Sequence, residues 1–267
     1  MEHTTRARRP RHVMIAISLQ SGSNGNCIYV ESGSTRLLFD AGISGLQAQR
    51  RLEQFGRDIR GVSAVVVSHD HRDHIACAGV YARKFGLPIH ASSATFAASE
   101  RHKLGRVGER CMFEPGQTLC FGELAVETIP TPHDAAAGVA FVVTDGLRRV
   151  GILTDLGHVF DGLGQTISTL DGVFLESNYD DEMLRTGPYP WPLQERIRGP
   201  QGHISNRESA ELLRDAAGPT LQWAVLSHLS EQNNRPDLAM QTHREIVSPH
   251  LPLHVASRYE AGEMLSV

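Results

Sequence analysis

The hydrophobic residues of this chain fall into short runs separated by turn residues, a pattern that predicts many β-strands with helices between them. Three runs near the N-terminus, at residues 14–19, 27–31 and 35–39, are separated by stretches rich in Ser, Gly and Asn. Such turns join neighbouring strands, so we expect a β-meander. A continuous apolar run at residues 64–67 then predicts a strand that is buried on both faces.

Helix signals alternate with further apolar runs over the rest of the chain. Ser205 and Glu208 form a capping box that predicts the start of a helix, and Pro236 suits the first position of another. Residues 180–202 are rich in proline and arginine, which indicates a lid or rim. The other expected helices lie at residues 44–55, 75–85, 92–104 and 236–247, and the other strands at 88–91, 118–121, 124–129, 139–144, 148–154, 173–175, 221–226 and 253–256.

The composition is that of an ordinary globular protein. Apolar residues make up 40% of the 267 residues and charged residues 21%, and the net charge is −4. This balance argues against a grip on nucleic acid by the whole surface, but it allows a local basic groove. We expect residues 1–13, which include four arginines, to form a disordered basic arm, and residues 14–267 to form a single domain.

Two features bear on the compartment. The four cysteines contain no C-x-x-C pair and indicate reduced thiols in a cytoplasmic protein; they are Cys27, Cys77, Cys111 and Cys120. No apolar run approaches the roughly 20 residues that span a bilayer, so we expect no membrane partner. The sequence leaves the oligomeric state open.

The stretch from Ser68 to His74 places three imidazoles and two carboxylates within seven residues. In an extended segment His69, His71 and Asp73 point to one side, and a turn after Asp73 can bring in His74. These donors suit borderline metals such as Zn, Mn or Fe. Four donors from one loop exceed what a single catalytic ion usually takes from one segment, so the stretch predicts two ions.

Further candidate ligands each follow a predicted strand: Asp40, His133, Asp155 and His228. A carboxylate such as Asp40 beside a metal loop commonly orients a ligand through a hydrogen bond, and it can also cap the next helix. Asp155 could bridge two ions or cap a helix. Because metal-type residues recur at strand ends, solvated loops explain the pattern poorly, and we interpret His133, Asp155 and His228 as ligands.

The order of these residues resembles the metallo-β-lactamase fold superfamily, whose pattern is Asp, His-x-His-x-Asp-His, His, Asp and His. Four longer segments are similar to the WalJ (YycJ) family of nucleases, at residues 21–27, 183–191, 202–206 and 228–234. The resemblance implies an α/β (α+β) fold, a four-layer αββα sandwich with the metal site at one sheet edge. It also implies a phosphodiesterase that acts on DNA as a 5′-to-3′ exonuclease.

The resemblance further implies two divalent ions per chain, Zn or Mn, with a water between them as the nucleophile. One ion would be held by His69, His71 and His133. The other would be held by Asp73, His74 and His228, with Asp155 as the bridge.

Other residues are expected to handle the substrate. His203 resembles the non-ligand histidine of related nucleases, which contacts the scissile phosphate or protonates the leaving group, although it could cap the following helix. Glu176 could orient His203 or a ligand. Free N–H groups at the helix start near Ser205 and Asn206 could hold a phosphate. Three arginines of the 180–202 segment are expected to line a DNA groove: Arg185, Arg196 and Arg198.

Three alternatives compete with the nuclease. A small-molecule hydrolase of the same fold would act on a thioester, lactone or lactam with the same metal-activated water. A redox enzyme would hold a mononuclear or di-iron centre, but nothing here resembles an attached flavin or rubredoxin domain. A non-catalytic metal-binding module fits poorly with a complete ligand set. The sequence leaves open Zn against Mn, DNA against RNA, exonuclease against endonuclease, and polarity.

Overall fold

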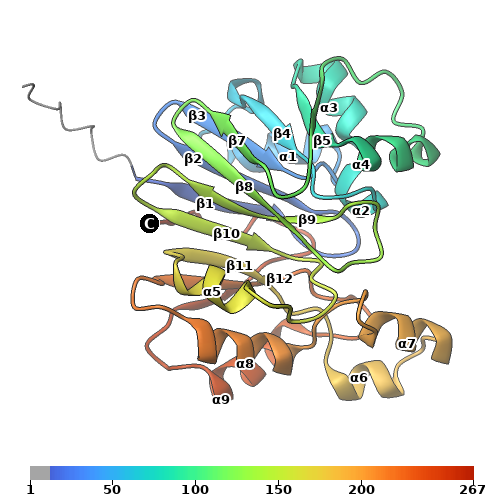
Figure 1. Ribbon diagram of the computed structural model, residues 1–267, viewed down its shortest axis with the longest axis vertical. Helices are drawn as coiled ribbons and strands as arrows, with labels where there is room; N and C mark the ends of the chain where they lie inside the picture. The colour runs from blue at the N-terminus through green and yellow to red at the C-terminus, as the bar shows by residue number, and fades with distance from the viewer. Residues whose placement is uncertain (1–12) are drawn as a thin grey trace, which may run out of the picture.

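The computed structural model describes residues 13–267; residues 1–12, nearly all of the expected basic arm, lie outside the described residues. Two seven-stranded sheets pack face to face, and helices cover both outer faces (Figure 1). This confirms the four-layer αββα sandwich expected from the sequence. One buried cluster lies between the two sheets. A second cluster lies between the first sheet and its helices, and a third lies between the second sheet and its helices.

The first sheet has the strand order β14-β1-β2-β3-β4-β5-β6. Strands β1, β2 and β3 form the expected antiparallel meander, while β3 to β6 run parallel to one another. Parallel strands end at the same edge, so the loops after β3 and β4 are neighbours. The strands are β1 (Ile15–Gln20), β2 (Cys27–Ser32), β3 (Thr35–Phe39), β4 (Ala64–Val66), β5 (Ile89–Ser92), β6 (Arg110–Phe113) and β14 (Leu265–Ser266).

The second sheet has the order β13-β12-β11-β10-β9-β8-β7. Strands β10 to β13 run parallel, so the loops that follow them also meet at one edge. The strands are β7 (Thr118–Phe121), β8 (Leu124–Pro130), β9 (Val139–Thr144), β10 (Arg149–Leu153), β11 (Gly172–Glu176), β12 (Trp223–Ser227) and β13 (Leu253–Val255).

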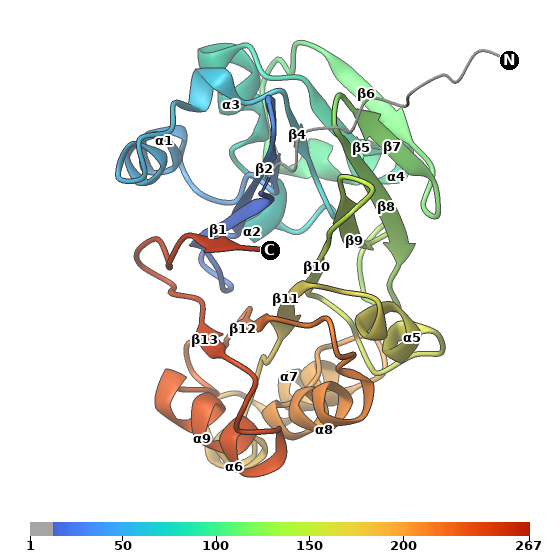
Figure 2. The same ribbon diagram turned by 90° about the vertical axis from the view of Figure 1, so that its left-hand side faces the viewer.

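Figure 2 shows α1 and α3 outside the first sheet and α5, α8 and α9 outside the second. The expected capping box begins α8, where Ser205 and Glu208 exchange side-chain and backbone hydrogen bonds. The helices are α1 (Gly45–Glu53), α2 (Arg72–Ile75), α3 (Ala78–Phe85), α4 (Ser93–Ala98), α5 (Leu163–Ser168), α6 (Asp181–Thr186), α7 (Trp191–Arg198), α8 (Asn206–Ala216) and α9 (Pro236–Ile246), with 3-10 turns η1 (Ile59–Gly61) and η2 (Ser99–His102). Among the described residues, none of these helices has the length and apolar character of a membrane span.

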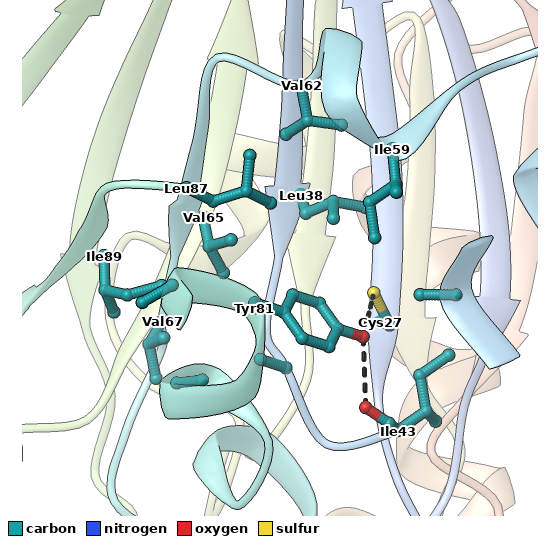
Figure 3. Close-up of a cluster of buried hydrophobic side chains, with 14 of the residues drawn as sticks. Cys27, Leu38, Ile43, Ile59, Val62, Val65, Val67, Tyr81, Leu87 and Ile89 are labelled. Atoms are coloured by element: carbon teal, nitrogen blue, oxygen red, sulfur yellow. Dashed lines mark hydrogen bonds between the residues drawn. The ribbon is translucent and has the colours of Figure 1, made fainter. Parts of the chain in front are cut away.

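Tyr81 of α3 lies in the buried cluster beneath the first sheet (Figure 3). Its hydroxyl donates to the carbonyl of Ile43 at 3.1 Å, so the buried polar group is satisfied. This bond ties α3 to the loop that follows β3, next to Asp40. Burial raises the pKa of the neighbouring Cys27 thiol to about 12, which makes it unreactive. The four cysteines are all free in the structure.

The structure differs from the sequence expectations in several places, among them the unexpected α5 and β14. The helix expected at 75–85 is two helices, α2 and α3, and the helix expected at 92–104 is shortened to α4 and a 3-10 turn. Strand β6 was not predicted. Residues 180–202 contain α6 and α7, because Asp180 caps α6 and Pro192 lies in the first turn of α7, where proline is tolerated.

Candidate metal centre

Metal-type side chains meet at the edge where the parallel strands of both sheets end. Asp40 directly follows β3, Asp155 lies two residues beyond β10, and His228 directly follows β12. Their φ angles are 65°, 59° and 58°, a left-handed conformation that residues other than glycine rarely adopt. Backbone strain of this kind clusters at functional sites. The surrounding fold therefore holds these side chains in specific orientations.

His69, His71 and His133 form the first donor group, with one nitrogen of each lying within 4.8 Å of the others. His71 Nδ1 and His133 Nε2 are 3.3 Å apart. The other ring nitrogens contact groups that can fix the rings: His69 Nδ1 lies 2.9 Å from the hydroxyl of Ser68, His71 Nε2 lies 3.1 Å from the carbonyl of Asp134, and His133 Nδ1 lies 2.9 Å from a backbone carbonyl. This arrangement leaves three nitrogens for one cation.

Asp73, His74 and His228 form the second donor group. Asp73 Oδ2 is 3.4 Å from the Nε2 atoms of both histidines. The expectation that Asp73 projects from an extended segment is wrong, because α2 begins at Arg72 and presents Asp73 and His74 from a helical turn. The helical turn therefore divides the segment from Ser68 to His74, so that His69 and His71 belong to the first donor group while Asp73 and His74 belong to the second.

Asp155 lies between the two groups. Its Oδ1 is 3.6 Å from His133 Nε2, and its Oδ2 is 3.4 Å from His74 Nε2. Asp155 Oδ2 and His69 Nε2 are buried and have no hydrogen-bond partner among residues 13–267. Because buried polar atoms without partners are costly and rare, a bound divalent cation explains both atoms. The site therefore fits a divalent metal in donor type and position.

The charges of these groups depend strongly on one another. Burial alone would raise the pKa of Asp155, but the imidazoles around it, His228 first, hold that pKa well below its usual range. Burial alone would lower the pKa of His228, but Asp155, Asp73 and Glu176 raise it to about 10. In the absence of metal these shifts favour ionised Asp155 and protonated His228, so a bound cation must displace a proton from His228.

Two buried carboxylates contact ligand candidates from outside the donor groups. Asp40 Oδ2 is 2.7 Å from His74 Nδ1, and its Oδ1 accepts from the amide and hydroxyl of Ser68. Glu176 ends β11, and its Oε1 is 3.2 Å from His228 Nδ1. Each contact leaves the Nε2 atom of its histidine directed to the site, the usual arrangement beside a bound metal.

His203 lies beside both donor groups. Its ring centroid is 5.0 Å from that of His133 and 5.2 Å from that of His228. Its Nδ1 is 2.7 Å from Glu176 Oε1, which therefore contacts His203 as well as a ligand candidate. Burial raises the pKa of Glu176, but the charge of His203 and its hydrogen bond outweigh burial and lower it to about 2. Glu176 is thus an ionised acceptor for the His203 ring.

Sequence reasoning gave no role to the turn between β1 and β2, although its residues belong to one of the family-like segments. Asn26 is buried, and its amide lies 3.0 Å from His74 Nε2 and 3.3 Å from Asp73 Oδ2. Ser21 accepts a hydrogen bond from the backbone amide of His228 at 2.8 Å. The turn therefore supports the second donor group, which only the fold brings to it.

The three arginines of the rim segment have different surroundings. Arg196 pairs with Asp134 at 2.5 Å, and the other oxygen of Asp134 lies 3.6 Å from both His71 Nε2 and His133 Nε2. Asp134 is a further residue that sequence reasoning did not assign. Arg185 and Arg198 instead pair with glutamates of their own helices. Only Arg196 is thus linked by these contacts to the first donor group.

The expectation that Ser205 and Asn206 bind phosphate needs correction. Both side chains are buried and used within the fold. Ser205 caps α8, and Asn206 exchanges hydrogen bonds with Asn234. The backbone amide of Asn206 also donates to the carbonyl of Tyr179. We therefore leave these two residues out of the substrate site.

Known proteins resemble this chain in sequence and in fold. Residues 35–228 match the model of the Beta-lactamase superfamily domain. The chain is 37% identical over 227 residues to the exodeoxyribonuclease WalJ of Streptococcus pneumoniae, covering 84% of each chain, and 36% identical to the exodeoxyribonuclease YycJ of Bacillus anthracis, covering 86% of this chain and 87% of the relative. The fold is similar to that of the metallo-beta-lactamase fold protein YhfI from Bacillus subtilis, with a TM-score of 0.73 at 20% identity over 96% of this chain and 100% of YhfI.

Proposed function

The chain belongs to the β-lactamase superfamily, in the family of the WalJ and YycJ exodeoxyribonucleases, and on this premise we propose that it is a metal-dependent exodeoxyribonuclease. It is a hydrolase that binds divalent metal and acts on nucleic acid. The observation that carries the proposal is the pair of donor groups on either side of Asp155, with a further histidine, His203, beside them. DNA as the substrate and 5′-to-3′ polarity are parts of the proposal.

We propose two ions, Zn or Mn, one for each donor group, with Asp155 between them. Seven donors exceed what a single four-coordinate catalytic ion takes from protein, which supports this number. Two ions in such a site lower the pKa of water and stabilise the charge of attacking and leaving oxygens. The chain's own contribution is to fix the donors, through Asp40 for His74 and Glu176 for His228.

His203 is proposed to act on the substrate and to leave the metal to the other donors. Its Nδ1 is held by ionised Glu176, so Nε2 is the nitrogen that can deliver a proton to the leaving oxygen. Arg196, half exposed above Asp134, is proposed to contact a DNA phosphate beside the first donor group.

One assay tests the function. End-labelled single-stranded and duplex DNA and RNA of one sequence are incubated with the protein loaded with Mn or Zn. Stepwise shortening of DNA from the 5′ end supports the proposal, and Asp155→Asn should abolish it. A matched control is Asp215→Asn, an exposed carboxylate paired with Arg214, which should keep full activity. Hydrolysis of thioesters or lactones with no cleavage of nucleic acid would refute the nuclease.

A further inference from the structure

A cavity of about 350 Å³ lies at the same sheet edge as the metal centre. It is lined by the loop after β12 and the segment after β13, including Leu229, Ser230, Val255 and Arg258. Strand β13 is the neighbour of β12, whose end positions His228. The cavity therefore lies beside the loop that carries His228 of the second donor group. Its volume is within the range of small-ligand sites.

Arg258 is held in this cavity by specific contacts. Its Nη1 donates to the carbonyl of Leu229 at 2.8 Å, and Nη2 lies 3.3 Å from the carboxylate of Glu231. A side chain at Gly22, whose φ angle is +136°, would meet Nη1 at 2.7 Å, so glycine is needed there. Arg258 Nε is buried and has no acceptor among residues 13–267. A donor of this kind suits an anionic ligand.

Tyr259 adds an aromatic surface to the same cavity. The residue is 67% exposed, while its hydroxyl donates to Glu231 at 2.8 Å. Glu231 therefore fixes both Tyr259 and Arg258, and its own charge is compensated by the arginine. An anchored ring with an open face is a suitable platform for stacking a nucleobase.

Resting on the exonuclease proposed above, we propose that this cavity holds the terminal nucleotide of the DNA strand being shortened. Arg258 contacts the terminal phosphate, and the base stacks on Tyr259. A site for one nucleotide next to the metal centre would explain why cleavage starts at an end.

The test compares DNA duplexes whose labelled strand ends in a 5′-phosphate, a 5′-hydroxyl or a 3′-phosphate. We expect the fully metal-loaded protein to prefer the 5′-phosphorylated end, as the proposed 5′-to-3′ polarity requires. Arg258→Gln should lower kcat/KM on that end by on the order of 10- to 100-fold and leave hydroxyl ends unchanged, with Arg258→Lys intermediate. Tyr259→Ser should raise KM by about 5- to 100-fold on every end. Arg214→Gln, an exposed arginine paired with Asp215, is the matched control.

Hydrolysis of bis(4-nitrophenyl) phosphate separates the cavity from the metal centre, because this small diester needs no terminal nucleotide. All variants should hydrolyse it at the rate of the unmodified protein. If Arg258→Gln slows all DNA ends equally, or if Tyr259→Ser leaves KM unchanged, the cavity is not the terminal site even though the nuclease stands. If Arg258→Gln lowers the melting temperature of the protein, its kinetic effect no longer reports on the cavity. The KM of Tyr259→Ser, a variant at an exposed residue, then decides whether the cavity is the terminal site. An unmodified protein that hydrolyses the diester but no DNA would refute the proposed function instead.

Discussion

Replacing His203 by alanine should slow DNA hydrolysis by on the order of 10²–10⁴, the usual contribution of a general acid, while the metal content stays the same. This loss corresponds to roughly 3–5 kcal/mol in the activation barrier. The structure supports an effect of this size because Glu176 Oε1 lies 2.7 Å from His203 Nδ1 and holds the ring in place. Burial raises the pKa of Glu176, but His203 outweighs burial and lowers that pKa to about 2, so Glu176 is ionised. The ring is thus fixed beside both donor groups before substrate binds.

The assay measures kcat on end-labelled duplex DNA and, in parallel, on thymidine 5′-(4-nitrophenyl phosphate), whose leaving group needs no proton. The loss for His203→Ala should largely disappear on the nitrophenyl substrate. Metal per chain is measured on the same samples. His158→Ala is the matched control, since His158 is exposed and its side chain is within hydrogen-bonding distance of only the carbonyl of Pro200 among the described residues.

A double variant tests whether Glu176 acts through His203. Glu176→Gln alone should cost about 10- to 100-fold, the usual effect of an orienting partner. If Glu176 acts only through His203, His203→Ala with Glu176→Gln should be no slower than His203→Ala, whereas a further loss would report its contact with His228. A lost ion in His203→Ala, or an equal loss on the nitrophenyl substrate, would each refute His203 as the acid.

Three further predictions concern other parts of the molecule. His69→Ala should leave the fold intact by circular dichroism while metal analysis falls from about two ions per chain to about one, and one ion in the unmodified protein would refute the two-ion site. Arg196→Gln should reduce the slope of log binding constant against log salt by roughly one, as expected for one lost phosphate contact, whereas Arg214→Gln should not change it. Burial lowers the pKa of His243 to about 4 from 6.5, so the contribution of neutral His243 to stability should be complete above pH 6.5 and fall by at most roughly 3 kcal/mol between pH 6.5 and 4. His243→Gln should flatten that dependence in denaturant titrations at each pH.

Much of the fold could be predicted from the chain because the apolar runs are short and well bounded. The meander, the buried strand β4 and the capped helix α8 need only local rules of alternation, turn chemistry and capping. Residues 180–202 were harder, because proline in the first turn of a helix reads like proline in a loop. Strand β6 has a mostly exposed side-chain pattern, so its pairing with β5, and not its hydrophobicity, makes it a strand.

The candidate ligands were also visible in the sequence, because His and Asp recur directly after predicted strands. The sequence did not show that these residues converge on one site, because the edge where they meet is made by two separate sheets. The residues are Asp40, His133, Asp155 and His228. Local sequence could not show that Ser205 and Asn206 are used for capping and amide pairing, or that Asn26 reaches the second donor group.

The sequence by itself determined which chemistry the chain can support, because donor type depends only on residue identity. Tertiary structure decided which donors share a site, because Asp73 and His228 are 155 residues apart in sequence and meet only when the two sheets pack. It also decided that Asp134 lies beside His71 and His133, and that Arg258 contacts Leu229 next to His228. These contacts depend on strand order and loop path, and no local pattern encodes them.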